Sequence, residues 1–262
     1  MLVCPVCGKK LCLESRRYVC EGAHSFDLAK EGYVNLLRSG KSGDLIGDDK
    51  QSARSRRGFL NKGYYKKLRN YFRELFQERS GTILDICCGE GYYTSAIGHS
   101  NLVVYGFDIS KEMVRLAAKR GNGVYFVANM ASIPVGNATF DYAIHLFAPF
   151  NEKEFCRVLK PGGKLYTVIP GEKHLYGLKQ ALYDTPYFND EKLPDTHQLK
   201  LVGCTKISAE ILLENETDID AVFRMTPYYF HTSQKDKEKL LGIKTLTTPI
   251  EFVIAEYEKG ES

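Results

Sequence analysis

Apolar residues recur at steps of three and four between Arg54 and Phe76, which is the spacing of an amphipathic helix. The basic residues of this stretch lie mostly on the opposite face. Farther along, Thr82–Ile86 is a short apolar run typical of a buried parallel strand. The small-residue turn Cys87–Gly91 comes next, and a helix is expected from Tyr92 onward. Strand, small-residue loop and helix in this order can present backbone amides to a nucleotide-like ligand.

The same alternation continues along the chain. A second strand is expected to end at Asp108, and a third to run over Val124–Ala128. A fourth begins after Asp141, the helix Glu152–Leu159 follows it, and a Pro-Gly-Gly turn leads into a fifth strand. Repeated strand–helix units of this kind predict an α/β fold with a doubly wound, Rossmann-like parallel sheet.

Composition agrees with a water-soluble chain. Its 262 residues suffice for one generous domain with a small module, and 44% of them are hydrophobic. No apolar run approaches the ~20 residues that span a bilayer. The first residues, Met-Leu-Val-Cys, show no basic segment leading into an apolar one, so no signal peptide is expected. We therefore expect a cytoplasmic protein without a membrane partner.

Charge is unevenly distributed. Residues 1–80 hold 17 Lys and Arg against 9 Asp and Glu, whereas residues 81–262 hold 19 against 23. A basic N-terminal part followed by a mildly acidic remainder suggests a polyanionic partner that binds the N-terminal part. A solvated basic helix is the alternative explanation.

The N-terminal cysteines have the spacing of a zinc site. Two close pairs, Cys4 with Cys7 and Cys20 with His24, are separated by twelve residues. Three thiolates and one imidazole form a standard tetrahedral set, and four protein ligands leave no open position for chemistry. Coincidence, a redox pair and disulfides are the alternatives. Cys12 alternates with leucines and is expected to be a small buried residue rather than a ligand.

The region of the cysteine pairs is expected to contain two short strands and to be followed by Phe26–Leu37, which packs on it. Glycine and serine residues then predict a hinge. Asp48 or Asp49 is placed to cap the helix that comes next.

NAD is the competing ligand for the loop Cys87–Gly91. An NAD site requires the pattern G-x-G-x-x-G. The chain has only Gly89 and Gly91 there, and the bulky Tyr92 and Tyr93 that follow would obstruct a pyrophosphate. A ligand without pyrophosphate therefore fits better. Asp108, which ends the second strand, can accept hydrogen bonds from ribose hydroxyls.

Four motifs, LDICCGEG, GFDIS, VANMASIPV and RVLKPGG, occur in this order between Thr82 and Pro170. Together they resemble the class I S-adenosylmethionine-dependent methyltransferases, which implies that fold and S-adenosyl-L-methionine as cofactor. The motif residues that the resemblance places at the cofactor are Asp85, Gly89, Gly91, Asp108 and Asn129. The family usually has Gly where this chain has Cys87, so we expect weaker or re-angled cofactor binding.

From Cys4 to about Phe230, the chain is similar to the bacterial RlmA-type 23S ribosomal RNA guanine-N1 methyltransferases. HSFDLAKEGYVNLL, RRGFLNKGYYKKL and APFNEKEFCRVLKPGG carry this resemblance together with the cysteine pairs. It implies structural Zn²⁺ held by the four N-terminal ligands. It adds four cofactor contacts, namely Tyr65, Tyr93, Thr94 and His174. Without the resemblance, Tyr65 would be a core aromatic residue and His174 a surface residue at a helix start.

The resemblance implies methyl transfer from S-adenosylmethionine to N1 of a guanine in a hairpin of 23S rRNA, by a homodimer. It divides the chain into a zinc-binding RNA-recognition module (residues 1–37), a flexible linker (38–53) and a methyltransferase domain (54–262). No residue is assigned as the base that removes the N1 proton; His145 is a candidate, with inward packing as its alternative. We expect the module to present four basic side chains to RNA phosphates, those of Lys9, Lys10, Arg16 and Arg17.

Two other functions remain open from the residues themselves. One is a methyltransferase acting on a small molecule or a protein, against which the basic N-terminal part argues. The other is a zinc-containing RNA-binding protein with a degenerate cofactor site, for which Cys87 is the support.

Overall fold

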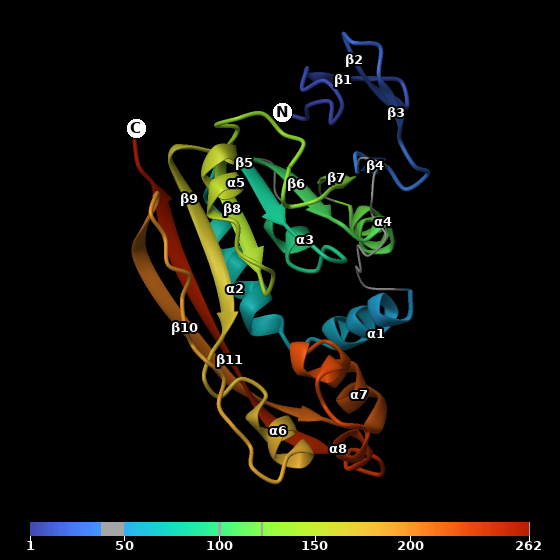
Figure 1. Ribbon diagram of the computed structural model, residues 1–262, viewed down its shortest axis with the longest axis vertical. Helices are drawn as coiled ribbons and strands as arrows, with labels where there is room; N and C mark the ends of the chain where they lie inside the picture. The colour runs from blue at the N-terminus through green and yellow to red at the C-terminus, as the bar shows by residue number, and fades with distance from the viewer. Residues whose placement is uncertain (38–49, 99–100, 122, 262) are drawn as a thin grey trace.

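The computed structural model describes residues 1–37, 50–98, 101–121 and 123–261. It contains a small antiparallel sheet near the N-terminus and a large sheet that runs through the rest of the molecule (Figure 1). The strands of the small sheet are β1 (Leu11–Glu14), β2 (Arg17–Cys20) and β3 (Ser25–Asp27). The two short strands expected among the cysteine pairs are thus β1 and β2.

The large sheet has the strand order β10-β11-β9-β8-β5-β6-β7-β4. Its strands are β4 (Val34–Asn35), β5 (Gly81–Ile86), β6 (Leu102–Asp108), β7 (Val124–Val127), β8 (Phe140–Leu146), β9 (Leu159–Pro170), β10 (Leu199–Leu213) and β11 (Leu246–Lys259). The pairs from β4 to β9 are parallel, which confirms the Rossmann-like arrangement. The β10–β11 hairpin pairs antiparallel with β9, so the sheet is mixed and not purely parallel.

Helices pack on both faces of this sheet. They are α1 (Lys50–Asn61), α2 (Lys66–Phe76), α3 (Thr94–Ile97), α4 (Lys111–Arg120), α5 (Glu152–Val158), α6 (Tyr176–Leu182), α7 (Glu216–Arg224), the 3₁₀ turn η1 (Pro227–Phe230) and α8 (Gln234–Glu238). Because successive side chains of a strand point to opposite faces, Ile83 packs in the core beneath α2 and Leu84 in the core beneath α5.

The prediction of one amphipathic helix from Arg54 to Phe76 is wrong. The segment forms two helices, α1 and α2, separated by a turn at Gly63. Gly63 has φ of +82°, a left-handed conformation that ends helices and that glycine adopts without strain. α1 begins at Lys50, inside the stretch expected to be linker. The remainder of that linker, including the expected caps Asp48 and Asp49, lies outside the described residues.

The N-terminal module is joined to the large sheet by backbone pairing. β4 lies parallel to β7, with Val34 opposite Phe126, and Leu36 N donates to the Val127 carbonyl at 2.9 Å. Leu2 forms an antiparallel bridge with Val135. The segment Phe26–Leu37, which was expected to pack on the strands of the cysteine pairs, instead begins inside β3 of the small sheet and contains β4 of the large sheet near its end.

None of the described helices has the length and apolar character that crossing a membrane would require.

Candidate functional site

A cavity of about 370 Å³ opens where the carboxyl ends of β5, β6 and β8 meet. This edge of a parallel sheet is where α/β folds bind ligands. The loop after β5 lines one side, and Asp108 and Ile109 continue from β6. Leu146–Pro149 follow β8 on the other side, while Arg56 and Leu60 reach in from α1.

The loop between β5 and α3 needs glycine for two reasons. Gly89 and Gly91 have φ of +54° and +76°, where side chains are strained. At Gly91 a Cβ atom would lie 2.9 Å from the Cβ of Ala117, so helix α4 could not pack as closely. The Gly89 amide donates to Asp108 Oδ2 at 3.0 Å, which ties the loop to the end of β6.

Cys87 is the non-glycine residue of this loop that has positive φ, at +58°. It lines the cavity, and its Sγ lies 3.9 Å from Met130 Sδ. Burial raises the pKa of the thiol to about 12, and the nearby charges of Asp108 and Asp85 add to the increase. The thiol is therefore neutral, and its side chain forms part of the cavity wall.

Asp85 lies at the bottom of the cavity and is buried. Thr94 donates a hydrogen bond from Oγ1 to Asp85 Oδ2. Burial raises the pKa of Asp85 to about 7; the hydrogen bond from Thr94 opposes the increase, and the charge of Asp108 adds to it. The carboxyl group thus titrates near neutrality, and a positively charged ligand beside it would lower this pKa and favour the ionised carboxylate.

Asp108 is oriented by its neighbours. Its Oδ2 accepts the Gly89 amide, and its Oδ1 accepts the Ser110 amide at 2.9 Å. Ser110 in turn caps α4 by accepting the Met113 amide. These contacts hold the Asp108 carboxylate at the end of β6, within the lining of the cavity.

Tyr65 and His174 lie together behind the cavity rather than in its lining. The Glu251 backbone amide donates to His174 Nδ1 at 3.1 Å. Burial lowers the pKa of His174 to about 4, so its ring is neutral at pH 7 and carries its proton on Nε2. Nε2 then donates to the Tyr65 hydroxyl oxygen at 3.2 Å. The hydroxyl proton of Tyr65 is not used in this contact.

The other expected cofactor contacts are divided between two places. Tyr93 lines the cavity, and its buried hydroxyl has no hydrogen-bond partner among the described residues. An unpaired buried hydroxyl is costly unless a ligand satisfies it. Thr94 does not line the cavity, and its hydroxyl is bonded to Asp85. Asn129 instead lines a separate cavity beside Cys4, where its Oδ1 accepts the Ala131 amide at 2.8 Å.

Sequence reasoning did not identify Glu90 and Arg120. Glu90 is buried, and its carboxylate accepts hydrogen bonds from Arg120 Nη2 at 2.7 Å and Nε at 2.8 Å. The Arg120 guanidinium also lies 5.7 Å from the ring centre of Tyr92. These contacts fix the loop against α4. They join positions 30 apart in the chain, and no local pattern signals such a pair.

His145 is an inward-packed residue. It is buried, and its Nε2 lies 3.0 Å from the Pro149 carbonyl oxygen. Burial lowers its pKa to about 4, and the hydrogen bond with Pro149 opposes the decrease. Its ring packs against Phe150 and Phe155 instead of lining the cavity.

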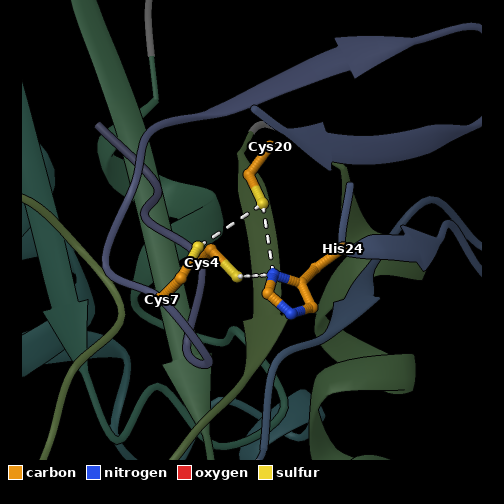
Figure 2. A group of neighbouring side chains, drawn as sticks. All are labelled: Cys4, Cys7, Cys20 and His24. Carbon is orange, nitrogen blue, oxygen red and sulfur yellow. Dashed lines mark hydrogen bonds between the residues drawn. The ribbon is translucent and has the colours of Figure 1, made fainter. Parts of the chain in front are cut away.

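Figure 2 shows the four N-terminal ligands turned toward one another. Their ligand atoms all lie within 4.8 Å of one another. Cys7 Sγ and Cys20 Sγ are 3.6 Å apart, and His24 Nδ1 lies 3.5 Å from Cys20 Sγ and 3.6 Å from Cys4 Sγ. A zinc tetrahedron with bonds of ~2.0–2.3 Å has edges of about 3.6–3.8 Å. The donor set therefore fits Zn²⁺.

Cys12 corrects one expectation. It is not part of the ligand cluster, as predicted, but it is exposed and not buried. The reason is that β1 belongs to a small sheet whose Cys12 face has no core against it; of this strand, Leu11 is the buried residue.

Two protein-family models match the chain. One is described as "RlmA, N-terminal" and matches residues 2–39; the other is "Methyltransferase domain" and matches residues 83–163. The 23S rRNA (guanine(748)-N(1))-methyltransferase of Streptomyces fradiae is 28% identical over 270 residues, which cover 97% of this chain and 95% of the relative. The protein named "Putative 23S rRNA (guanine-N(1)-)-methyltransferase YxjB" of Bacillus subtilis (strain 168) is 34% identical, over 71% of this chain and 70% of the relative. A demethylmenaquinone methyltransferase of Bacillus licheniformis is 29% identical over 45% of this chain.

Proposed function

Because this chain belongs to the family of 23S rRNA (guanine-N1)-methyltransferases, we propose that it transfers the methyl group of S-adenosyl-L-methionine to N1 of a guanine in a hairpin of 23S rRNA. The observation that carries the proposal is that the Cys4/Cys7/Cys20/His24 cluster and the cavity after β5 belong to one continuous structure, joined by β4. The demethylmenaquinone methyltransferase of Bacillus licheniformis, whose name specifies a small molecule, matches less than half of the chain. The Streptomyces fradiae relative matches nearly all of it.

The cavity residues fit S-adenosylmethionine. Asp108 can accept hydrogen bonds from ribose hydroxyls, and the carboxyl group of Asp85 suits a positively charged part of the cofactor. The hydroxyl of Tyr93 lacks a partner within the described residues, and Tyr65 has a hydroxyl proton to donate. When bound, the cofactor supplies a methyl group on a sulfonium, which is already a good electrophile. The protein's task is then mainly alignment.

Methyl transfer forms the bond between guanine N1 and the methyl carbon and breaks the bond between that carbon and sulfur. The proton of guanine N1 must leave in the same reaction. In a paired guanine, N1 points into the base pair, so the enzyme must use an unpaired or extruded base. His145 is unsuited to accept the proton, since it does not line the cavity and burial lowers its pKa to about 4.

The zinc module is proposed to select the RNA. Lys9, Lys10, Arg16 and Arg17 are all exposed on it. Zinc would hold the β1–β2 hairpin in one conformation and take no part in methyl transfer, since four protein ligands close its coordination shell. We place the enzyme in the cytoplasm, where ribosomes are assembled, and propose that it works as a homodimer. Sedimentation of the purified protein measures this oligomeric state directly.

Mass mapping tests the proposed function. 23S rRNA lacking the modification is incubated with the enzyme and S-adenosylmethionine, digested, and analysed by mass spectrometry. The expected result is one additional methyl group on a single guanine, with the base-pairing edge blocked. The guanine at 748, which the Streptomyces fradiae relative's name specifies, is the first to inspect. Methylation of a small molecule or protein but not RNA would contradict the proposal, as would failure to bind S-adenosylmethionine.

A further inference from the structure

Phe147 has an unusual backbone conformation at the rim of the cavity. It directly follows β8 and lines the cavity, and 43% of its surface is exposed. Its φ is +55°, in the left-handed region. A bulky aromatic residue rarely adopts this conformation, and strained residues of this kind cluster at active sites and ligand clamps.

Core packing does not account for this strain. Leu175 has a similar φ of +58°, but it is buried at 2% exposure, so apolar burial compensates for its conformation. Phe147 has nearly half of its surface in solvent and gains much less. Phe147 nevertheless lines the cavity, so its exposed ring surface lies at the rim of the proposed cofactor site.

One face of the Phe147 ring is supported from behind. The His174 ring lies nearly parallel to it, with centroids 6.5 Å apart and an interplanar angle of 24°, and Phe252 packs at 5.8 Å. His174 cannot rotate freely, because both of its ring nitrogens are hydrogen-bonded, to Glu251 and Tyr65. The Phe147 amide is also fixed, by donation to the Val168 carbonyl at 3.1 Å. The ring is thus held in place by its neighbours while 43% of the residue stays exposed to solvent.

We propose that Phe147 is the platform on which the target guanine stacks while its N1 faces the methyl donor. This inference rests on the proposed function, which requires an unpaired guanine at the cavity. Every base has a π-face that stacks on aromatic side chains, and enzymes that modify bases hold the extruded base in this way. A ring that is already immobilised loses little conformational entropy when the base binds.

Two substitutions at Phe147 separate stacking from simple apolar contact. Phe147→Leu keeps an apolar side chain and the same backbone requirement but removes the π-face, whereas Phe147→Tyr keeps the ring. Each enzyme is assayed with 23S rRNA transcript and tritiated S-adenosylmethionine. Because stacking of one base changes affinity by roughly 5- to 150-fold, Phe147→Leu should lower kcat/KM within that range, and Phe147→Tyr should stay near wild type.

Phe188 provides a matched control. It is 48% exposed and stacks on Tyr176 at 4.6 Å, but it does not line the cavity. Phe188→Leu should leave kcat/KM unchanged. Calorimetry with S-adenosylhomocysteine should give the same affinity for all four enzymes, which also shows that each is folded.

Three results would overturn the inference. Phe147→Leu could match the wild type in kcat/KM, Phe147→Tyr could fall as far as Phe147→Leu, or Phe147→Leu could lose S-adenosylhomocysteine binding, which would assign the ring to the cofactor. A wild-type enzyme that methylates no RNA at all would instead contradict the proposed function, so the two failures are distinguishable.

Discussion

The imidazole of His174 and the hydroxyl of Tyr65 lie 3.2 Å apart, although 109 positions separate them in the chain. The contact joins the turn before α2 to the segment after β9. The direction of this hydrogen bond is set by Glu251, whose backbone amide donates to His174 Nδ1 and leaves Nε2 as the donor. Tyr65 is therefore a hydrogen-bond acceptor toward His174 and can be a donor toward the cofactor.

Replacing Tyr65 by Phe is expected to weaken cofactor binding as well as stability. The loss of a buried hydrogen bond lowers the free energy of unfolding by about 1 kcal/mol. Tyr64→Phe is the control, because its hydroxyl donates to Asp218 at 2.7 Å and has no contact with His174. Both variants should be less stable in urea unfolding, but calorimetry should show weaker S-adenosylmethionine binding only for Tyr65→Phe. Equal affinities would remove Tyr65 from the cofactor site.

Cys87→Gly should stabilise the protein and preserve or tighten cofactor binding. An L-residue in the left-handed region is disfavoured by ~1–2 kcal/mol, and the greater flexibility of unfolded glycine offsets part of the gain, so a net increase of about 1 kcal/mol is expected. Cys88→Gly should instead destabilise, because Cys88 is buried and has no positive φ. Urea unfolding and calorimetry measure the two effects. A clear loss of cofactor affinity in Cys87→Gly would show that the thiol helps to hold the ligand.

Asp85 should make the protein less stable as pH rises from about 4 to about 7. Its folded-state pKa is raised to about 7 from 3.8, so the folded state binds a proton in this range that the unfolded state has released. About three pKa units correspond to an upper bound on the order of 4 kcal/mol. Asp85→Asn should remove this slope, raise stability at pH 8 and weaken S-adenosylmethionine binding, measured by urea unfolding at several pH values and by calorimetry.

Asp141 offers the opposite sign for comparison. Burial raises the pKa of Asp141, but hydrogen bonds from Lys160 and Thr82 outweigh this effect and lower the pKa overall. The stability that the ionised Asp141 contributes is present above its unfolded-state pKa and is lost as pH falls. The Asp141→Asn variant should therefore be less stable than the wild type at neutral pH. If Asp85→Asn and Asp141→Asn shifted the pH profile in the same direction, the protonation assigned to Asp85 would be wrong.

Zinc should be needed for RNA methylation but not for cofactor binding. His24→Ala removes one ligand of the closed set, whereas His24→Cys replaces it with another zinc ligand. Atomic absorption should find zinc in the wild type and in His24→Cys, and strongly reduced zinc in His24→Ala. All three should bind S-adenosylhomocysteine, while His24→Ala loses activity on 23S rRNA. Wild-type protein purified without any zinc would refute the assignment.

The exposed basic residues of the module should control the salt dependence of RNA binding. Replacing Lys9, Lys10, Arg16 and Arg17 by Gln should weaken binding and flatten the plot of log affinity against log salt, by roughly 0.7–0.9 for each RNA phosphate that is no longer neutralised. The control replaces four exposed lysines of the C-terminal part, namely Lys192, Lys200, Lys235 and Lys244. Filter binding at several salt concentrations compares them. An unchanged slope in the first variant would mean that the module only supports the structure.

Local patterns predicted the strands that are buried on both faces. The apolar run Thr82–Ile86 lies within β5, and the strand expected to end at Asp108 is β6. The break at Gly63 was missed because the apolar spacing of α2 continues that of α1 across the turn. The long β10–β11 hairpin was not predicted. Strand β10 is mostly exposed and lacks a long buried run, whereas β11 contains the buried apolar run Phe252–Ala255, a signal that the sequence reasoning did not use.

The site was only partly predictable for a related reason. Asp85, Gly89 and Asp108 lie in short motifs that a single sequence shows. Pairs such as Glu90 with Arg120 exist only because α4 packs on the loop, and the conformation of Phe147 depends on β9 and β11 beneath it. Side chains that are positioned by tertiary packing leave no trace at fixed spacing.

The two-residue strand β4 links zinc binding to the protection of the enzyme against aggregation. Val34 and Asn35 occupy the backbone groups along the outer side of β7, which would otherwise be an open strand. Without zinc, the module before β4 loses the metal bonds that order it, and β4 is held only by its pairing with β7 and by the apolar contacts of Tyr33, Val34 and Leu36. Protein made under zinc starvation would then expose the backbone of β7 to pairing with other chains, so metal supply would govern how much enzyme stays free of aggregates.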